Sequence, residues 1–148
     1  MTIRRFAMIF GIAFLIIGAS GFIPGLSPEH SHPDVRLTTG LSLAMGLFPV
    51  NVLHNIVHLL FGVWGLMASK SLPAAKGYAK TVAIVYALLM VMGLISGGNV
   101  HTTFGLIPLY GNDVWLHAVL AAIAAYFGFG PVPAGEGYDD SGAAVRGA

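Results

Sequence analysis

Cysteine is absent from the 148 residues, which excludes disulfide bonds, thiolate nucleophiles, iron–sulfur clusters and thiolate zinc sites. Charged residues are scarce at 9% of the chain, whereas a soluble domain usually carries about 25%. So few charges cannot cover the surface of a water-soluble domain. The seven Lys and Arg residues form no run and no strip interleaved with aromatic residues, so nothing in the sequence indicates nucleic-acid binding.

Hydrophobic residues make up 56% of the chain, and they gather into four long segments. A membrane-spanning helix needs roughly 20 mostly apolar residues. The sequence therefore predicts an all-α integral membrane protein, a bundle of four transmembrane helices in up-down-up-down order. The expected spans are Phe6–Leu26, Val50–Ser69, Ala79–Ser96 and Val114–Gly130. Residues 1–133 are expected to form a single membrane domain, and residues 134–148, rich in Gly, Ala and Asp, a flexible tail.

Two segments allow more than one interpretation. The first span follows Arg4 and Arg5, as in a signal peptide, but its apolar run of about 20 residues exceeds the usual signal core of about 7–15. We therefore predict a retained helix. The apolar segment Leu37–Val50 contains Gly40, Gly46 and Pro49 and is too short to span comfortably. An interfacial or re-entrant helix between the first two spans is expected there.

The basic residues predict the orientation of the spans. Cytoplasmic loops of membrane proteins carry an excess of Lys and Arg. Six of the seven basic residues agree with a cytoplasmic location of both termini and of the loop between the second and third spans: Arg4, Arg5, Lys70, Lys76, Lys80 and Arg146. The other two loops, one of which carries Arg36, are then expected to face outward.

Polar residues recur at helical spacing in two of the spans. In the second span they are Asn51, His54, Asn55 and His58, followed by Gly62 and Gly65. In the fourth span they are Asp113 and His117, followed by Ala121, Ala125 and Gly128. Residues three or four apart share a helix face, so each set forms one stripe. Both stripes enter from the outer side under the assigned topology, and His101 in the connecting loop could join them.

The polar cluster has a structural interpretation. Asn51 and Asp113 (or Asn112) stand where helix N-caps belong. Histidines on a helix interface can hydrogen-bond to a neighbouring helix, at about 0.6 kcal/mol per bond. Asn51, Asn55 and His101 then serve as structural polar residues.

Three functional interpretations stay open beside it. His54, His58, His117 and Asp113 could bind zinc, and copper is compatible although no methionine aligns with the histidines. His58 and His117 could instead hold the iron of a non-covalent haem b. A quinone, lipid or proton-handling site is the third. Intramembrane ionisable residues often mark such sites. Nothing resembling a serine nucleophile elbow, HExxH or a phosphate-binding glycine loop is present, which disfavours an enzyme.

Two stretches of the sequence resemble the motifs of a known family. Residues 48–62, FPVNVLHNIVHLLFG, and residues 105–117, GLIPLYGNDVWLH, are similar to the signature of the DUF4383 family. The resemblance covers about residues 3–130 and implies a small bacterial membrane protein with four spans. It places Asn51, His54, Asn55, His58, Asp113 and His117 at motif positions, and it implies no activity, substrate or cofactor.

From these observations we expect a non-enzymatic protein of the bacterial inner membrane, multi-pass with both termini cytoplasmic. The leading hypothesis is a small accessory or scaffold subunit without a cofactor, packed among lipids beside other membrane subunits or copies of itself. The alternative is a metal- or haem-binding protein, redox or ligand-binding, that uses the outer His/Asp cluster.

Overall fold

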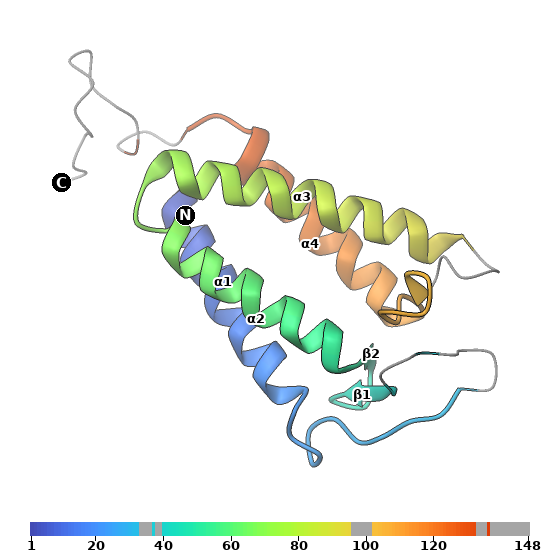
Figure 1. Ribbon diagram of the computed structural model, residues 1–148. Helices are drawn as coiled ribbons and strands as arrows, with labels where there is room; N and C mark the ends of the chain where they lie inside the picture. The colour runs from blue at the N-terminus through green and yellow to red at the C-terminus, as the bar shows by residue number, and fades with distance from the viewer. Residues whose placement is uncertain (33–36, 38–39, 96–101, 133–135, 137–148) are drawn as a thin grey trace.

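The computed structural model describes residues 1–32, 37, 40–95, 102–132 and 136. These described residues form four helices and one small antiparallel hairpin, and successive helices run back and forth (Figure 1). The elements in chain order are α1 (Ile3–Ser20), β1 (Ser42–Ala44), β2 (Phe48–Val50), α2 (Val52–Ala68), α3 (Leu72–Leu94) and α4 (Asn112–Phe129). The expected all-α architecture is thus confirmed at the level of four helices.

Side-chain caps fix where the first three helices begin. The Thr2 hydroxyl accepts a hydrogen bond from Arg5 N, so α1 begins before the expected span. Asn51 is the N-cap of α2, as the sequence predicted. Ser71 caps α3, which starts seven residues earlier than expected because Pro73 lies in its first turn, where proline is tolerated.

The start of α4 corrects one prediction. The N-cap position is occupied by Gly111, which makes no side-chain capping bond. Neither Asn112 nor Asp113 is therefore the cap. Both belong to the first helical turn, and the Asp113 side chain is turned inward and buried instead of satisfying backbone N–H groups.

The helices pack as two pairs, α1 with α2 and α3 with α4 (Figure 1). Glycines allow the close approach of the first pair. A Cβ built on Gly65 would lie 2.8 Å from the Cα of Gly11, and one built on Gly11 would lie 2.9 Å from the carbonyl oxygen of Gly62. In the second pair, a Cβ built on Gly128 would lie 2.8 Å from the backbone nitrogen of Lys80. The glycine stripes predicted from the sequence are thus used for packing within the chain.

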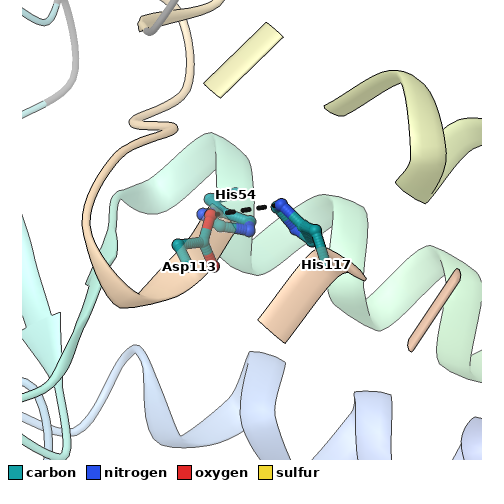
Figure 2. A group of neighbouring side chains, drawn as sticks. All are labelled: His54, Asp113 and His117. Atoms are coloured by element: carbon teal, nitrogen blue, oxygen red, sulfur yellow. Dashed lines mark ion pairs between the residues drawn. The ribbon is translucent and has the colours of Figure 1, made fainter. Parts of the chain in front are cut away.

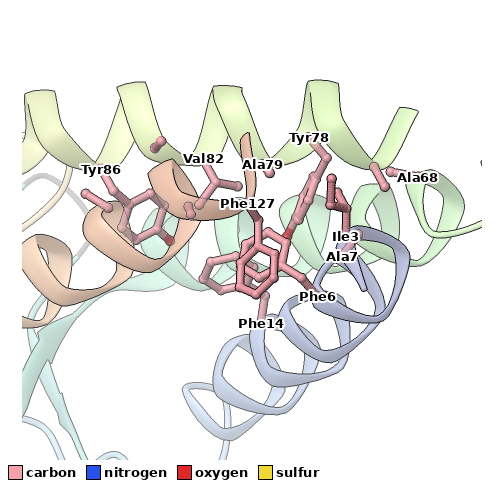
Figure 3. Packing of buried hydrophobic residues seen from close by; sticks show 14 residues of the cluster. Ile3, Phe6, Ala7, Phe14, Ala68, Tyr78, Ala79, Val82, Tyr86 and Phe127 are labelled. Carbon is pink, nitrogen blue, oxygen red and sulfur yellow. The ribbon is translucent and has the colours of Figure 1, made fainter. Parts of the chain in front are cut away.

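An aromatic core joins the two pairs (Figure 3). The Phe6 ring stacks on the ring of Phe127 from α4, with centroids 4.7 Å apart. Further along α1, the Phe14 ring lies 5.7 Å from that of Tyr86 on α3. Offset and edge-on aromatic pairs stabilise by about 0.5–1.5 kcal/mol beyond their buried area. These contacts hold α1 against α3 and α4.

The segment between α1 and α2 differs from the prediction. An interfacial or re-entrant helix was expected over Leu37–Val50, but its described C-terminal part is a hairpin in which Ala44 pairs with Phe48. Pro49 lacks a backbone N–H and is disfavoured inside a helix, whereas Gly46 adopts a positive φ of 69° in the hairpin turn. The segment therefore turns back on itself instead of coiling.

Among the described residues, three helices are long and apolar enough to cross a membrane: α1, α3 and α4. The expected second span, α2, is apolar but has 17 residues. At 1.5 Å per residue this helix covers about 26 Å, a little less than the hydrocarbon core of a typical bilayer. A membrane location is therefore plausible, while the four-span topology and the orientation of the termini stay predictions.

Glu136 is expected to stabilise the start of α1. Its carboxylate oxygens accept hydrogen bonds from Ile3 N at 2.6 Å and Arg4 N at 2.8 Å. These N–H groups lack partners within the helix, and negative charge is favourable at a helix N-terminus. Glu136→Ala should lower the free energy of unfolding by about 1 kcal/mol, measured by thermal unfolding in detergent. Glu136→Gln keeps an acceptor and should lose less, and equal losses would contradict this account.

Candidate functional site

The polar residues of the two stripes lie on buried faces. On α2 the buried set includes His54, Asn55 and His58, and on α4 it includes Asp113 and His117. Both helices present these residues from their N-terminal halves. The predicted periodicity is therefore confirmed, and it directs the two stripes into the interior of the helix assembly.

Three of these side chains meet between α2 and α4 (Figure 2). His54, Asp113 and His117 each offer one ligand atom, and these atoms all lie within 4.8 Å of one another. The three side chains are buried, with exposed fractions of 2–4%. Ligand atoms around a tetrahedral zinc ion lie roughly 3.4 Å apart, given metal–ligand distances of about 2.0–2.2 Å. Contraction of the longest of these separations by about 1.4 Å would bring this set to bonding geometry.

The polar atoms of this group have few partners. Nδ1 of His54, Nδ1 of His117 and Oδ2 of Asp113 are buried without a hydrogen bond in the described structure. Asp113 Oδ2 and His117 Nδ1 form an ion-pair contact at 3.5 Å, longer than the roughly 2.7–2.9 Å of a charge-assisted hydrogen bond. Buried polar groups are nearly always hydrogen-bonded, so a cluster of unsatisfied ones calls for a partner.

The orientation of His54 suits a ligand. The His54 imidazole lies close to the backbone carbonyl of Pro49, while its Nδ1 is buried without a hydrogen bond. Metal-bound histidines usually donate their other ring N–H to a carbonyl or carboxylate, which fixes the tautomer and the ring orientation. The hairpin that precedes α2 therefore positions this side chain.

His58 lies beside the three-residue group. Its ring centroid is 4.5 Å from that of His54, and its face stacks on Phe14 at 5.6 Å with an interplanar angle of 13°. Its Nδ1 is also buried without a hydrogen bond. The structure thus brings all four predicted metal-ligating residues into one region and leaves His58 one helical turn from the tightest cluster.

The remaining predicted residues are placed differently. Asn51 donates to the Leu106 carbonyl at 2.6 Å, tying α2 to the loop before α4. Asn55 lines a cavity of ≈ 370 Å³ together with Gly21 and Glu29. His101 lies outside the described residues, so the prediction that it joins the cluster stays open.

One neighbour of the site was missed by the sequence reasoning. Tyr86 on α3 is 3% exposed, and its ring packs edge-on against His117 with centroids 4.8 Å apart. The available signal was a phenol placed in the apolar middle of a helix, a position where lipid alone gives it no hydrogen-bond partner.

Asn51 should support the site through the first turn of α2. Its side-chain oxygen accepts from His54 N at 2.9 Å while its amide binds Leu106. Asn51→Ala should therefore cost about 1–2 kcal/mol of unfolding free energy in thermal unfolding. Asn51→Ser keeps a capping oxygen and should lose roughly half as much, whereas wild-type stability of the alanine variant would refute the role.

Fold and site together define a small helical protein with three helices able to cross a membrane and a buried His/Asp cluster between α2 and α4. The family model for DUF4383, a domain of unknown function, matches residues 4–130. The chain therefore belongs to the DUF4383 family, and the predicted resemblance is confirmed. No curated protein and no solved structure matches it.

Proposed function

We propose that this chain is a membrane-embedded metal-binding protein that holds one divalent transition-metal ion, preferably zinc, between α2 and α4. The observation that carries the proposal is the convergence of His54, Asp113 and His117, whose ligand atoms lie within 4.8 Å of one another in a buried site. Two imidazoles and one carboxylate are a ligand set that zinc accepts.

The burial of the Asp113 carboxylate favours a cluster that holds a cation over a cluster without one. Asp113 is 3% exposed, and an isolated ionised carboxylate is costly to bury unless it is paired or coordinates a metal. No Lys or Arg is paired with it in the described structure. A divalent ion would supply both the counter-charge and the missing partner for the two imidazoles.

The packing favours a bare ion over haem. A haem held by His58 and His117 would need a flat space between the two imidazoles for its macrocycle. Instead, Phe14 stacks on His58 and Tyr86 packs on His117. The same imidazole nitrogens could also bind copper. The mass-spectrometric experiment therefore compares zinc with copper.

The accessory-subunit hypothesis stays a prediction. Large apolar side chains are exposed on the helices, among them Leu60, Met67 and Leu88. Lipid tails and partner helices would cover these faces equally well. The glycines of α1, α2 and α4 that could admit a partner helix, among them Gly11, Gly62 and Gly128, are already in close contact within the chain. We also propose that the protein lies in the bacterial inner membrane with both termini on the cytoplasmic side.

Native mass spectrometry of the protein extracted in mild detergent tests the metal. After incubation with one equivalent of zinc or copper and removal of the excess, the intact chain should carry the mass of one ion. Asp113→Asn should lose the ion because an uncharged amide is a poor ligand. Glu29→Gln, outside the cluster, is the matched control and should retain it. A bare wild-type mass with both metals would overturn the proposal.

A further inference from the structure

The basic side chains are gathered at one end of the helix assembly. Every Lys and Arg that the structure describes belongs to the first turn of α1, the turn between α2 and α3, or the first half of α3: Arg4, Arg5, Lys70, Lys76 and Lys80. The hairpin lies at the opposite end (Figure 1). We call the surface formed by these five residues the basic end.

Contacts between helices join these residues into one surface. Arg4 Nε donates a hydrogen bond to the Ser69 carbonyl at 3.0 Å, which connects the start of α1 to the turn after α2. Lys76 Nζ donates to the Gly130 carbonyl at 3.4 Å, which connects α3 to the end of α4. The basic end is therefore a continuous surface to which all four helices contribute.

The basic end has an excess of positive charge. Glu29 pairs with the β1 strand and Asp113 lies in the first turn of α4, so both acids belong to the hairpin end. Glu136 does lie at the basic end, but its carboxylate accepts hydrogen bonds from the backbone N–H groups of Ile3 and Arg4. Within the described part of the chain, no Lys or Arg side chain forms an ion pair. An anionic partner is therefore the complement of this surface.

The position of the basic end indicates what that partner is. Of the three helices able to cross a membrane, α1 and α3 begin at this end and α4 finishes there. Exposed aromatic side chains stand near the same end, Trp64 on α2 and Tyr126 and Phe129 on α4. Trp and Tyr are enriched at the membrane–water interface. In a bilayer the basic end would therefore lie among lipid head groups.

We propose that the basic end binds anionic phospholipids, represented by phosphatidylglycerol, through their phosphate groups. Arg and Lys form charge-assisted hydrogen bonds with phosphate oxygens. Each basic residue close to an anionic membrane surface strengthens binding about fivefold. Zwitterionic phosphatidylcholine neutralises its own phosphate and should compete poorly. The inference rests on the membrane location in the proposed function, and it does not depend on the metal site.

The two tryptophans of the chain can report on its two ends. Trp64 lies near the basic end, with its ring 5.1 Å from that of Tyr78, and Trp115 lies in the first turn of α4. Brominated acyl chains quench tryptophan fluorescence on contact. The single-tryptophan proteins Trp115→Phe and Trp64→Phe are reconstituted in phosphatidylcholine bilayers with increasing fractions of brominated phosphatidylglycerol or brominated phosphatidylcholine. Trp64 should show at least fivefold higher apparent affinity for phosphatidylglycerol, whereas Trp115 should not distinguish the two lipids.

Charge variants of the Trp115→Phe protein test the role of the basic residues. Arg5, Lys70 and Lys80 are exposed, so replacing all three by Gln should abolish the preference at Trp64 without unfolding the protein. The matched control Arg5→Lys, Lys70→Arg, Lys80→Arg keeps the charges and should keep the preference. Lys70→Gln alone, in the turn between α2 and α3, should lower it.

The outcomes separate this inference from the membrane location on which it rests. A preference that survives the three Gln substitutions, or an equal preference at both tryptophans, would overturn lipid binding at the basic end and leave the membrane location standing. Absence of quenching by either brominated lipid would overturn both.

Discussion

Replacing His117 by alanine is expected to weaken zinc binding by at least about 100-fold. Loss of a residue that only supports a metal ligand typically costs 10–100-fold in affinity, so loss of a direct ligand should cost more. His117 is central to the group because its Nδ1 lies 3.5 Å from Asp113 and its ring lies 6.4 Å from that of His54. Competition with a chromophoric zinc chelator measures the affinity of both forms.

The control separates ligation from packing. His117 is 2% exposed, so His117→Ala also leaves a space in the interior and should lower the stability of the metal-free protein. His117→Gln fills more of that space and should still lose zinc. His30→Ala removes an exposed imidazole outside the cluster and should bind zinc like the wild type. Equal affinities of all four proteins would contradict the assigned ligands.

Replacing Gly11 by alanine is expected to lower the free energy of unfolding by about 2 kcal/mol. The added Cβ would lie 2.8 Å from Leu66 N and 2.9 Å from the Gly62 carbonyl oxygen. Both are backbone atoms, so α1 and α2 must separate to admit the methyl group. Overpacking of this kind costs about 1–3 kcal/mol, and the gain in helix propensity offsets part of it. Thermal unfolding in detergent provides the measurement.

The chain contains a matched control for this change. Gly77 lies inside α3, and a Cβ built there meets nothing within 4 Å. Gly77→Ala should leave stability unchanged or raise it by up to about 1 kcal/mol, because alanine is the better helix former. If both substitutions shift the unfolding temperature by the same amount, the close α1–α2 contact does not carry the stability assigned to it.

Much of the helical arrangement could be predicted because its signals are local. Long apolar segments give the helices, and the three- and four-residue spacing of His54, His58, Asp113 and His117 gives the buried faces. Asn51 was recognised as a cap from its position before an apolar run. Each of these inferences uses residues within one or two helical turns.

Other features depend on contacts that no local pattern encodes. The third helix begins at Leu72, before the expected Ala79, because Pro73 stands in its first turn, where a proline is compatible with a helix. The hairpin before α2 depends on the tight turn at Gly46. The pairing of α1 with α2 and the packing of Tyr86 on His117 join residues distant in sequence, so neither contact could be foreseen.

X-ray absorption spectroscopy of the zinc-loaded protein in nanodiscs tests the central claim most directly. The extended fine structure at the zinc edge reports only the atoms around the bound ion. The ligands that it identifies can therefore be compared with the proposed set of His54, Asp113 and His117. The account predicts a four-coordinate nitrogen and oxygen shell at about 2.0–2.1 Å, with outer scattering from two imidazoles. Scattering from a six-coordinate shell of water oxygens, without imidazole features, would contradict it.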